Sequence, residues 1–298
     1  MWRSTLLPLL LLATISLTAC APTPRAVDQP GAVLSAAQPS AGSGRPVNMA
    51  VRYEVNDLAP KRTGGAAWEF TKRAFNAYLA VIDSDSIPRP YLAEALPQLT
   101  SDSWRVFPDG RMETTYRLKP NLTWHDSRPL AADDFVFSYQ VYSSRGLGGT
   151  FISSPQDQME DVLAPDARTV VIRWRTLYPQ AGALVSQLFE PLPRHILDTP
   201  FKAYEQDPAS LDPFLSLPYW TTEFVGLGPF KVNRWEPGST LEGVAFDGHA
   251  LGRPKIDRLV IHFIPDENTV MTNLLAGAVD LAGDTSIRFE QATVLKRQ

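Results

Sequence analysis

Proline is the residue that most restricts how this chain can fold. It occupies 26 of the 298 positions, well above the usual share of about 5%. Because proline lacks a backbone N–H and clashes with the preceding helical turn, we expect irregular connections and no long uninterrupted helices. The hydrophobic content of 44% is ordinary for a globular chain, and the chain from Val47 onward suffices for one large or two ordinary domains.

Hydrophobic periodicity places short elements between the prolines. Residues 112–118 alternate between one face and the other, which predicts a half-buried strand. The preceding Asp109-Gly110 predicts a tight turn that pairs this strand with residues 103–107. We expect further strands at residues 169–174, 259–264 and from 279, and helices at residues 131–143, 180–188 and 267–275. Short strands and helices in alternation indicate an α/β fold.

The first twenty residues have the pattern of an export signal. Arg3 provides a positive start, residues 6–15 are largely apolar, and the small residues Thr18 and Ala19 follow. The apolar run is shorter than the roughly 20 residues that a membrane-spanning helix needs. We therefore expect residues 1–20 to be a signal peptide that is removed on export.

Cys20, at the end of this signal, is the only cysteine in the chain. The sequence Leu17-Thr18-Ala19-Cys20 resembles the lipobox of bacterial lipoproteins. The resemblance implies that Cys20 carries the lipid that anchors the protein to a bilayer. An anchoring role also removes the need for a disulfide partner. The alternative is an ordinary secretion signal with a chance cysteine.

Residues 21–46 have the composition of a disordered tether. Five prolines lie there among alanine, serine and glycine, and such a segment buries too little apolar surface to fold. As a flexible coil it would span roughly 25–30 Å. The formal net charge of −4 offers no sign of the basic face that nucleic-acid binding requires, so we expect no nucleic-acid partner.

Three stretches occur in a characteristic order. The first is residues 92–139, with "LAEAL", Asp-Gly, "LTWHD" and "AADD" segments, and the second is "DARTVVIRW". The third is "VGLGPFKVNRWEPGSTL" followed by "GRPKIDRLVIHFIPDENTVMTNLLAGAVDLAG". In this order they resemble the family 5 extracellular solute-binding proteins, which include the oligopeptide and dipeptide receptors of ABC importers. Each stretch alone is weak, but the ordered set is specific.

The resemblance implies a two-lobed fold similar to type II periplasmic binding proteins. Family members continue well beyond the last matching segment, so we expect the C-terminal lobe to be missing from a truncated chain. We predict that residues 47–88 and 221–298 form a discontinuous first lobe. Residues 89–220 are then expected to form a smaller inserted subdomain, because proline-rich junctions lie near both of its ends.

The resemblance also suggests where a ligand would lie. The sequence "EVNDLAPK", residues 54–61, is similar to a family turn that lines the ligand cleft, although Ala59 stands where the family has aspartate. Glu54, Val55 and Asn56 are therefore expected at the cleft edge. Trp220 is the tryptophan that we expect to face the cleft, whereas most of the others should lie in the core.

A glycine-rich crossover follows Trp220. We expect Gly226, Gly228 and Pro229 to shape a chain crossing, because glycine permits positive φ and proline fixes the next φ; a phosphate cradle is the alternative. Leu227 departs from the family, which has Gly or Thr there. The segment "EGVAFDGHALGRPK" replaces the family's Arg-Asn-Pro-x-Tyr, so we expect an altered loop.

No pattern in the sequence indicates a metal, a cofactor or a catalytic residue. The histidines show no ligand spacing, and the sequence has no Gly-x-Ser-x-Gly or Ser-x-x-Lys nucleophile motif. The histidines are His125, His195, His249 and His262.

The leading hypothesis is a substrate-binding protein of an ABC importer, lipid-anchored in the bacterial cell envelope, on the periplasmic side or the outer face of the cytoplasmic membrane. It would capture peptides or similar small solutes by hinge closure and deliver them to a permease. The alternatives are a secreted lipoprotein enzyme such as a hydrolase, and a scaffold lipoprotein that keeps the same fold without transport.

Overall fold

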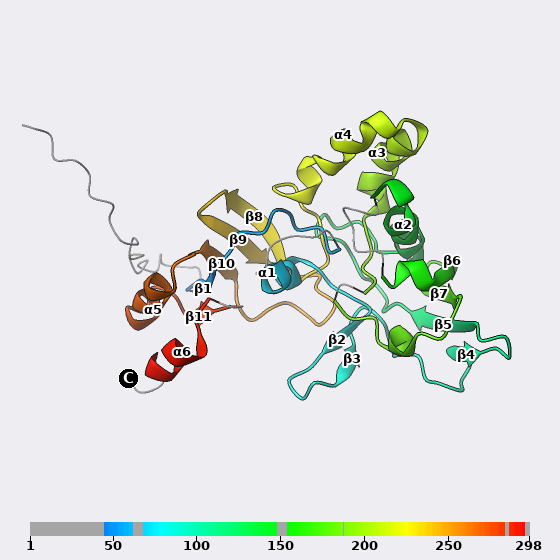
Figure 1. Cartoon of the computed structure of the whole chain (residues 1–298), viewed down its shortest axis with the longest axis horizontal. Helices are drawn as coiled ribbons and strands as arrows, with labels where there is room; N and C mark the ends of the chain where they lie inside the picture. The colour runs from blue at the N-terminus through cyan, green and yellow to red at the C-terminus, as the bar shows by residue number, and fades with distance from the viewer. Residues whose placement is uncertain (1–44, 62–67, 148–153, 187, 284–285, 296–298) are drawn as a thin grey trace, which may run out of the picture. The chain divides into compact units, whose positions relative to one another are not determined.

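The structure is a computed structural model that describes residues 45–61, 68–147, 154–186, 188–283 and 286–295 (Figure 1). The predicted signal peptide, Cys20 and nearly all of the predicted tether lie outside the described residues. The described residues all belong to one compact unit. In the described part of the chain, no helix is both long and apolar enough to cross a membrane.

A five-stranded mixed sheet brings together strands from the two ends of the described chain. Its order is β11-β1-β10-β9-β8. Strand β1 (Val47–Val51) lies parallel to β10 (Arg258–Phe263) and to β11 (Leu281–Ala282). Strands β9 (Thr240–Ala245) and β8 (Phe230–Glu236) continue the sheet antiparallel. The strands predicted at residues 259–264 and from 279 are confirmed within one or two residues.

Helix α5 (Glu267–Leu275) and helix α6 (Phe289–Leu295) follow the parallel strands. Asp266 caps α5, because its carboxylate accepts the Thr269 N–H at 2.8 Å. The chain leaves the helix through Gly277, whose φ of +66° suits glycine. Ala50 of β1 packs with Val270 and Val279 in a small apolar cluster. The predicted helix at residues 267–275 is therefore confirmed.

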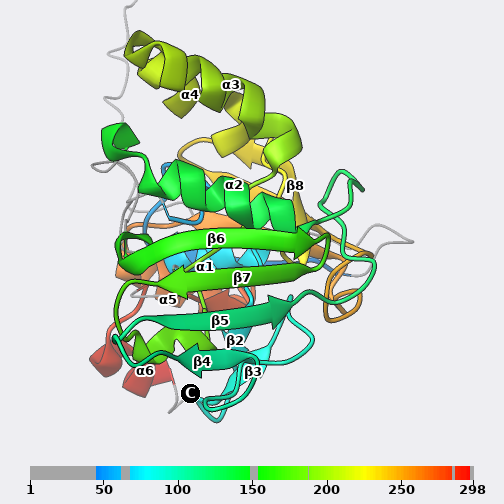
Figure 2. The ribbon, with the colours of Figure 1, turned by 90° about the vertical axis from the view of Figure 1, so that its right-hand side faces the viewer.

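A four-stranded antiparallel sheet has the order β4-β5-β7-β6 (Figure 2). Its strands are β4 (Trp104–Val106), β5 (Met112–Arg117), β6 (Met159–Asp166) and β7 (Thr169–Trp174). The hairpin predicted at Asp109-Gly110 joins β4 to β5, with Gly110 at a φ of +83°. The predicted face of β5 is buried, including Thr114 and Tyr116. These strand predictions are confirmed.

Helix α2 (Ala132–Ser143) runs along β6 and confirms the helix predicted at residues 131–143 (Figure 2). Asp134 in its first turn accepts the Ala131 N–H at 3.0 Å and the Arg194 N–H at 3.1 Å. Burial raises the pKa of the Asp134 carboxyl. Helix α3 (Arg194–Gln206) is the longest helix in the described residues, with 13 residues, and it contains Pro200 in its interior.

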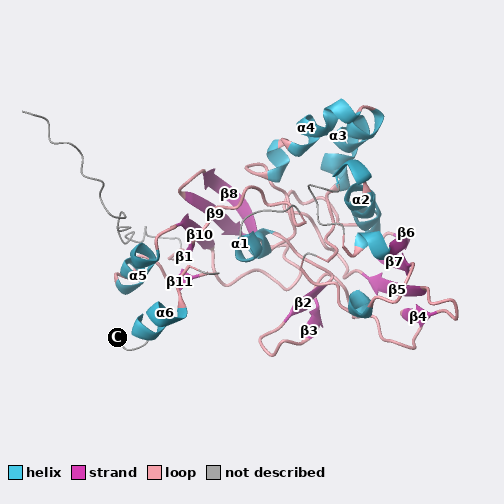
Figure 3. Ribbon diagram, in the orientation of Figure 1, coloured by secondary structure: helices cyan, strands magenta, loops and turns pink. Residues whose placement is uncertain are grey.

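The helix predicted at residues 180–188 is wrong. A 3₁₀ turn spans Pro179–Gly182, and an irregular segment follows it (Figure 3). Its backbone groups bond partly in short turns within the segment, such as the Val185 N–H to the Ala183 C=O at 3.0 Å, and partly to neighbouring elements. The Leu184 C=O accepts the Ala80 N–H at 3.1 Å, and the Leu184 N–H donates to the Tyr116 hydroxyl at 3.3 Å. Apolar composition alone did not distinguish a helix from a buried irregular segment.

Shorter elements complete the described chain. Helix α1 (Trp68–Phe75) precedes the hairpin of β2 (Ala80–Ile82) and β3 (Pro88–Pro90), and helix α4 (Leu211–Leu215) follows α3. The five-stranded sheet draws on residues 47–51 and 230–282, whereas the four-stranded sheet draws on residues 104–174. The boundaries proposed for a first lobe and an inserted subdomain stay a prediction.

Candidate functional site

Three chain segments emerge at one edge of the five-stranded sheet. In the parallel register, Val51 of β1 lies beside Phe263 of β10, and Ala50 lies beside Ala282 of β11. The segments after these strands therefore leave the sheet on the same side. In open α/β sheets, ligands bind outside the carboxyl ends of the strands. We call this place the carboxyl edge: residues 52–61, 264–267 and 286–288.

Glu267 ties the three segments of the carboxyl edge together. Its Oε1 atom lies 2.9 Å from Arg52 Nη1, just after β1, and 3.0 Å from Arg288 Nε, after β11. The carboxylate is mostly buried and sits in the first turn of α5, where the helix dipole favours a negative charge. The Arg52 guanidinium lies over the Tyr53 ring at 5.4 Å. Through these two ion pairs, Glu267 at the start of α5 joins the segment after β1 to the segment after β11.

Glu54 has no free carboxylate oxygen in the described structure. Its Oε1 accepts the Trp235 indole N–H at 2.7 Å, and its Oε2 accepts the Gly238 N–H at 2.8 Å. Glu54 therefore fixes the start of the 54–61 segment to the β8–β9 hairpin. Val55 is buried, whereas Asn56 is exposed. Contact of these residues with a ligand stays a prediction, and Asn56 is the one whose side chain is presented to solvent.

A buried polar network lies beneath the 54–61 segment, and sequence reasoning missed it. Lys72 Nζ donates to the Ala59 C=O at 2.6 Å and lies 3.3 Å from Asp57 Oδ1. Asn76 Nδ2 donates to the Leu58 C=O at 3.1 Å. Lys72 and Asn76 are four residues apart across the end of α1, so they face the same way. This four-residue spacing indicates that the two side chains act together only once the bounds of α1 are known.

The glycines of the crossover are required by close packing, not by φ. A Cβ on Gly226 would lie 2.1 Å from the Phe75 carbonyl oxygen, and a Cβ on Gly228 would lie 2.4 Å from the Phe75 carbonyl carbon. Neither glycine is among the described residues with positive φ, so the expected reason is wrong. Pro229 continues the crossing, and its C=O accepts the Phe246 N–H at 2.9 Å. The crossover therefore runs against the end of α1.

His125 bridges the same crossover. The Gly226 N–H donates to His125 Nδ1 at 3.1 Å, and His125 Nε2 lies 3.0 Å from the Gly228 C=O. Burial lowers the pKa of His125 to about 4, so the ring is neutral near pH 7. With Nδ1 accepting, Nε2 carries the hydrogen and donates to Gly228. In the described residues, no group of His, Cys, Asp and Glu could hold a metal ion.

The expectation that Trp220 faces a cleft is wrong for this structure. Its side chain is only 1% exposed. The indole N–H donates to the Phe214 C=O at 2.7 Å, and the ring packs edge-on against Phe214 and Tyr219. The Trp220 C=O accepts the Leu58 N–H at 2.8 Å. Trp220 therefore supports the 54–61 segment from within the core.

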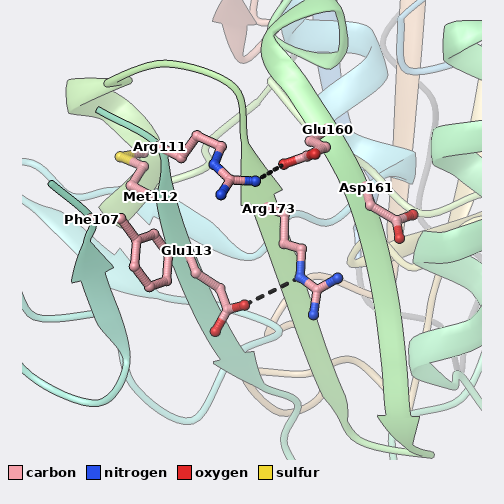
Figure 4. Close-up of a pocket in the computed structure, with 7 residues that line it drawn as sticks. All are labelled: Phe107, Arg111, Met112, Glu113, Glu160, Asp161 and Arg173. Atoms are coloured by element: carbon pink, nitrogen blue, oxygen red, sulfur yellow. Dashed lines mark hydrogen bonds and ion pairs between the residues drawn. The ribbon is translucent and has the colours of Figure 1, made fainter. Parts of the chain in front are cut away.

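A separate cavity of about 380 Å³ lies on the open face of the four-stranded sheet (Figure 4). Four of its five charged lining groups pair with one another: Arg173 lies 3.4 Å from Glu113, and Arg111 lies 3.7 Å from Glu160. The fifth, Asp161, accepts the Val162 N–H at 2.9 Å. Arg105 also pairs with Glu113. Because these charges are balanced by neighbours on the same sheet, the cavity gives no sign of a particular ligand.

Comparison with known proteins places the chain in a family. The family model for bacterial extracellular solute-binding proteins, family 5, matches residues 94–297. The oligopeptide-binding protein AppA of Bacillus subtilis is 27% identical over 63% of this chain, and the dipeptide-binding protein of Escherichia coli is 26% identical over 58% of it. The chain spans only about a third of the length of these relatives: 31% and 33%.

Solved structures share the fold. An oligopeptide-binding protein from Thermus thermophilus, complexed with a pentapeptide, matches with a TM-score of 0.72 at 21% identity, over 83% of this chain and 45% of its own. The nickel–histidine complex of NikZ from Campylobacter jejuni matches with a TM-score of 0.63 at 22% identity, over 78% and 42%. The described fold is thus part of a type II periplasmic binding protein, as the sequence predicts. The chain belongs to the bacterial extracellular solute-binding proteins of family 5.

Proposed function

We propose that this chain forms one wall of a receptor that captures peptides or similar small solutes for an ABC importer. The observation that carries the proposal is the place of the 54–61 segment. This segment resembles the family's cleft turn, and it leaves β1 at the carboxyl edge of the sheet, where α/β folds bind ligands. Family membership supports the same function.

The carboxyl edge presents polar and aromatic groups on a rigid support. Tyr53 is 43% exposed, and Asn56 is also exposed. The amide of Asn56 can both donate to and accept from a peptide backbone. Because Glu54 and the network of Lys72 and Asn76 already hold the segment, little conformational entropy remains to be lost on binding.

We further propose that capture uses hinge closure. The chain spans about a third of its relatives, so the wall described here would meet a ligand from one side. A ligand that favours the closed state shifts the equilibrium toward it by its differential affinity. Arg288, bound to Glu267, lies on the segment that leaves β11. Release of solute to a permease completes the proposed function, which includes no bond-making step.

Lipid anchoring through Cys20 is part of the proposal. It rests on the lipobox-like Leu17-Thr18-Ala19-Cys20 and on the tether composition of residues 21–46. Cys20→Ser should move the protein from the membrane fraction to the soluble fraction, because the variant cannot receive the lipid. Retention of this variant on membranes after a high-salt wash would contradict the anchor.

Peptide binding is tested by ligand-observed NMR with trialanine as the probe. Contact on one side only should give weak binding, with a dissociation constant on the order of 1 mM or weaker. Asn56→Ala should weaken it about three- to ten-fold by removing hydrogen bonds. Asn233→Ala, an exposed position on β8, is the matched control. Equal binding by Asn56→Ala and the parent chain would overturn the placement of the ligand.

A further inference from the structure

A second, more apolar cavity of about 280 Å³ opens beside the β2–β3 hairpin. We call it the tyrosine pocket. The residues used below that line it are Arg73, Tyr78, Ile82, Tyr91, His249 and Leu251. It involves none of the residues that form the carboxyl edge, so it is a candidate for a different ligand.

Aromatic and aliphatic side chains form the walls of the tyrosine pocket. The rings of Tyr78 and Tyr91 meet edge to face, with their centres 6.3 Å apart, and both are largely buried. Ile82 and Leu251 are 41% and 58% exposed. Apolar walls with a small number of polar groups are typical of small-molecule sites, and aromatic walls favour an aromatic occupant.

The Tyr91 hydroxyl supplies a hydrogen-bond donor to the tyrosine pocket. His249 Nδ1 accepts the Leu251 N–H at 3.4 Å, and His249 Nε2 lies 2.9 Å from the Tyr91 hydroxyl. Burial lowers the pKa of His249, so the ring is neutral near pH 7 and its one hydrogen is on Nε2. His249 therefore donates to the Tyr91 oxygen. Burial raises the pKa of Tyr91, so its hydroxyl keeps a proton to donate to an acceptor.

The charges around the tyrosine pocket favour a neutral ligand. Arg73 lines the cavity at the end of α1, but it already has an interaction partner within the protein. Burial raises the pKa of the Tyr78 hydroxyl most, and the Glu190 carboxylate raises it more strongly than Arg73 lowers it. The field near this hydroxyl therefore disfavours an anion. No Asp or Glu is among the described residues that line the cavity, so a cationic ligand would find no carboxylate there.

We propose that the tyrosine pocket binds a small neutral aromatic molecule with one hydrogen-bond acceptor, such as an aryl ketone. Its ring would lie against Tyr78, Ile82 and Leu251, and its acceptor would receive the Tyr91 hydroxyl hydrogen. A cavity of about 150 Å³ holds one benzene ring. The volume of about 280 Å³ therefore suits one ring with a short polar substituent.

The origin of the lining residues separates this site from the peptide site. His249 and Leu251 belong to "EGVAFDGHALGRPK", the segment where the chain departs from the family's Arg-Asn-Pro-x-Tyr pattern. The partner that orients the Tyr91 hydroxyl and one exposed wall of the pocket thus come from this altered segment. The inference goes beyond the proposed function and does not depend on it.

The first test compares four probes of similar size by ligand-observed NMR on the 298-residue chain at pH 7. Acetophenone is neutral and has an acceptor, ethylbenzene is neutral without one, phenylacetate is an anion and 1-phenylethylamine is a cation. Acetophenone should bind with a dissociation constant on the order of 1 mM. We expect each of the other three probes to bind at least about three-fold more weakly. Equal or tighter binding of either charged probe, or no binding of acetophenone, would overturn the proposal.

The second test removes the donor and keeps the ring. Tyr91→Phe should weaken acetophenone about three- to ten-fold and leave ethylbenzene unchanged, because only the ketone uses the hydroxyl. Tyr53→Phe, at the exposed tyrosine of the carboxyl edge, is the matched control and should change neither. If Tyr91→Phe weakens both probes equally, or neither, the hydroxyl does not select the ligand.

The third test fills the cavity. Ile82→Trp and Leu251→Trp each place a larger side chain at an exposed wall and should reduce acetophenone binding at least about ten-fold. Ile87→Trp, at an exposed isoleucine of the same hairpin that does not line the cavity, is the matched control. Circular dichroism confirms that each variant folds.

Binding that survives both cavity-filling variants would place acetophenone elsewhere and contradict the site. So would a dimer of the parent chain that Ile82→Trp disrupts, since a second copy would then occupy the pocket. Asn56→Ala should not change acetophenone binding, which distinguishes failure of this inference from failure of the peptide test.

Discussion

The two sheets use charged side chains in different ways. On the four-stranded sheet, the half-exposed Arg105 and Arg173 both pair with Glu113, whose carboxylate is mostly buried, across β4, β5 and β7. Around the five-stranded sheet, Lys72 and Asp57 lie almost wholly inside the protein. Exposed pairs contribute little to stability, whereas loss of one partner from a buried pair is costly. The comparison indicates that the buried pair beneath the 54–61 segment positions the backbone, whereas the pairs on the four-stranded sheet, each with a half-exposed arginine, contribute less to stability.

The largest expected difference in stability is between alanine substitutions at two glycines. Gly228→Ala should destabilise the fold by about 4 kcal/mol or more, because the new Cβ would overlap the backbone of residues 74–76. Gly110→Ala, in the β4–β5 turn, meets no atom within 4 Å and suffers only from its φ of +83°. It should cost about 1–2 kcal/mol. Urea unfolding measures both. Similar losses would show that the crossover is less tightly packed than the structure indicates.

The buried ion pair provides the second test. Lys72→Met should destabilise by about 3–5 kcal/mol, because it leaves the Asp57 carboxylate buried without its lysine and frees the Ala59 C=O. Arg173→Gln on the four-stranded sheet should cost less than about 1 kcal/mol, since Glu113 keeps Arg105. Chemical denaturation at constant pH gives the two values. A Lys72→Met loss as small as that of Arg173→Gln would refute the positioning role.

The two sheets also differ in how far the sequence could predict their strands. The alternation in residues 112–118 specified β5 and its hairpin, because antiparallel strands with one open face carry a local signal. Strand β1 has no such signal: it pairs with strands more than 200 residues away, and three successive residues, Met49, Ala50 and Val51, are buried. Long-range pairing of this kind is specified only by the assembled core.

The candidate site was likewise predictable only where the signal is local in the sequence. The 54–61 segment and the crossover glycines could be located by family resemblance, but not the reasons for them. Gly226 and Gly228 are needed because α1 passes close by, and Trp220 is enclosed by Phe214 and Tyr219. Lys72 and Asn76 become recognisable only when the end of α1 lies under the segment that they hold. Each of these facts depends on residues distant in sequence.

His125 should make the crossover sensitive to acid. Its folded pKa of about 4 lies below the ordinary value of 6.5. Between these pH values the unfolded state binds a proton that the folded state does not, so stability falls as pH drops from about 7 to 4. The shift corresponds to about 3 kcal/mol. Urea unfolding across this pH range should show the loss in the parent chain.

Two variants identify the group responsible. His125→Gln should flatten the pH dependence between 7 and 4, because glutamine does not titrate. His195→Asn, which removes the surface partner of Asp126, should retain it. If the parent and His125→Gln lose the same stability on acidification, other groups govern the pH dependence and the burial of His125 is not its cause.

The smallest expected losses of stability come from neutralising one carboxylate at each sheet. Glu267→Gln removes the charge shared by Arg52 and Arg288 and the favourable charge at the start of α5. We expect a loss of about 1 kcal/mol that shrinks at high salt, because both arginines are partly exposed. Glu160→Gln, whose carboxylate lies 3.7 Å from Arg111 across the four-stranded sheet, should change stability by only a few tenths of a kcal/mol. Thermal unfolding at two salt concentrations resolves the pair. If Glu160→Gln costs as much as Glu267→Gln, then the carboxyl edge is no more firmly held than the open sheet face, and rigidity cannot be the reason that the 54–61 segment is suited to bind a ligand.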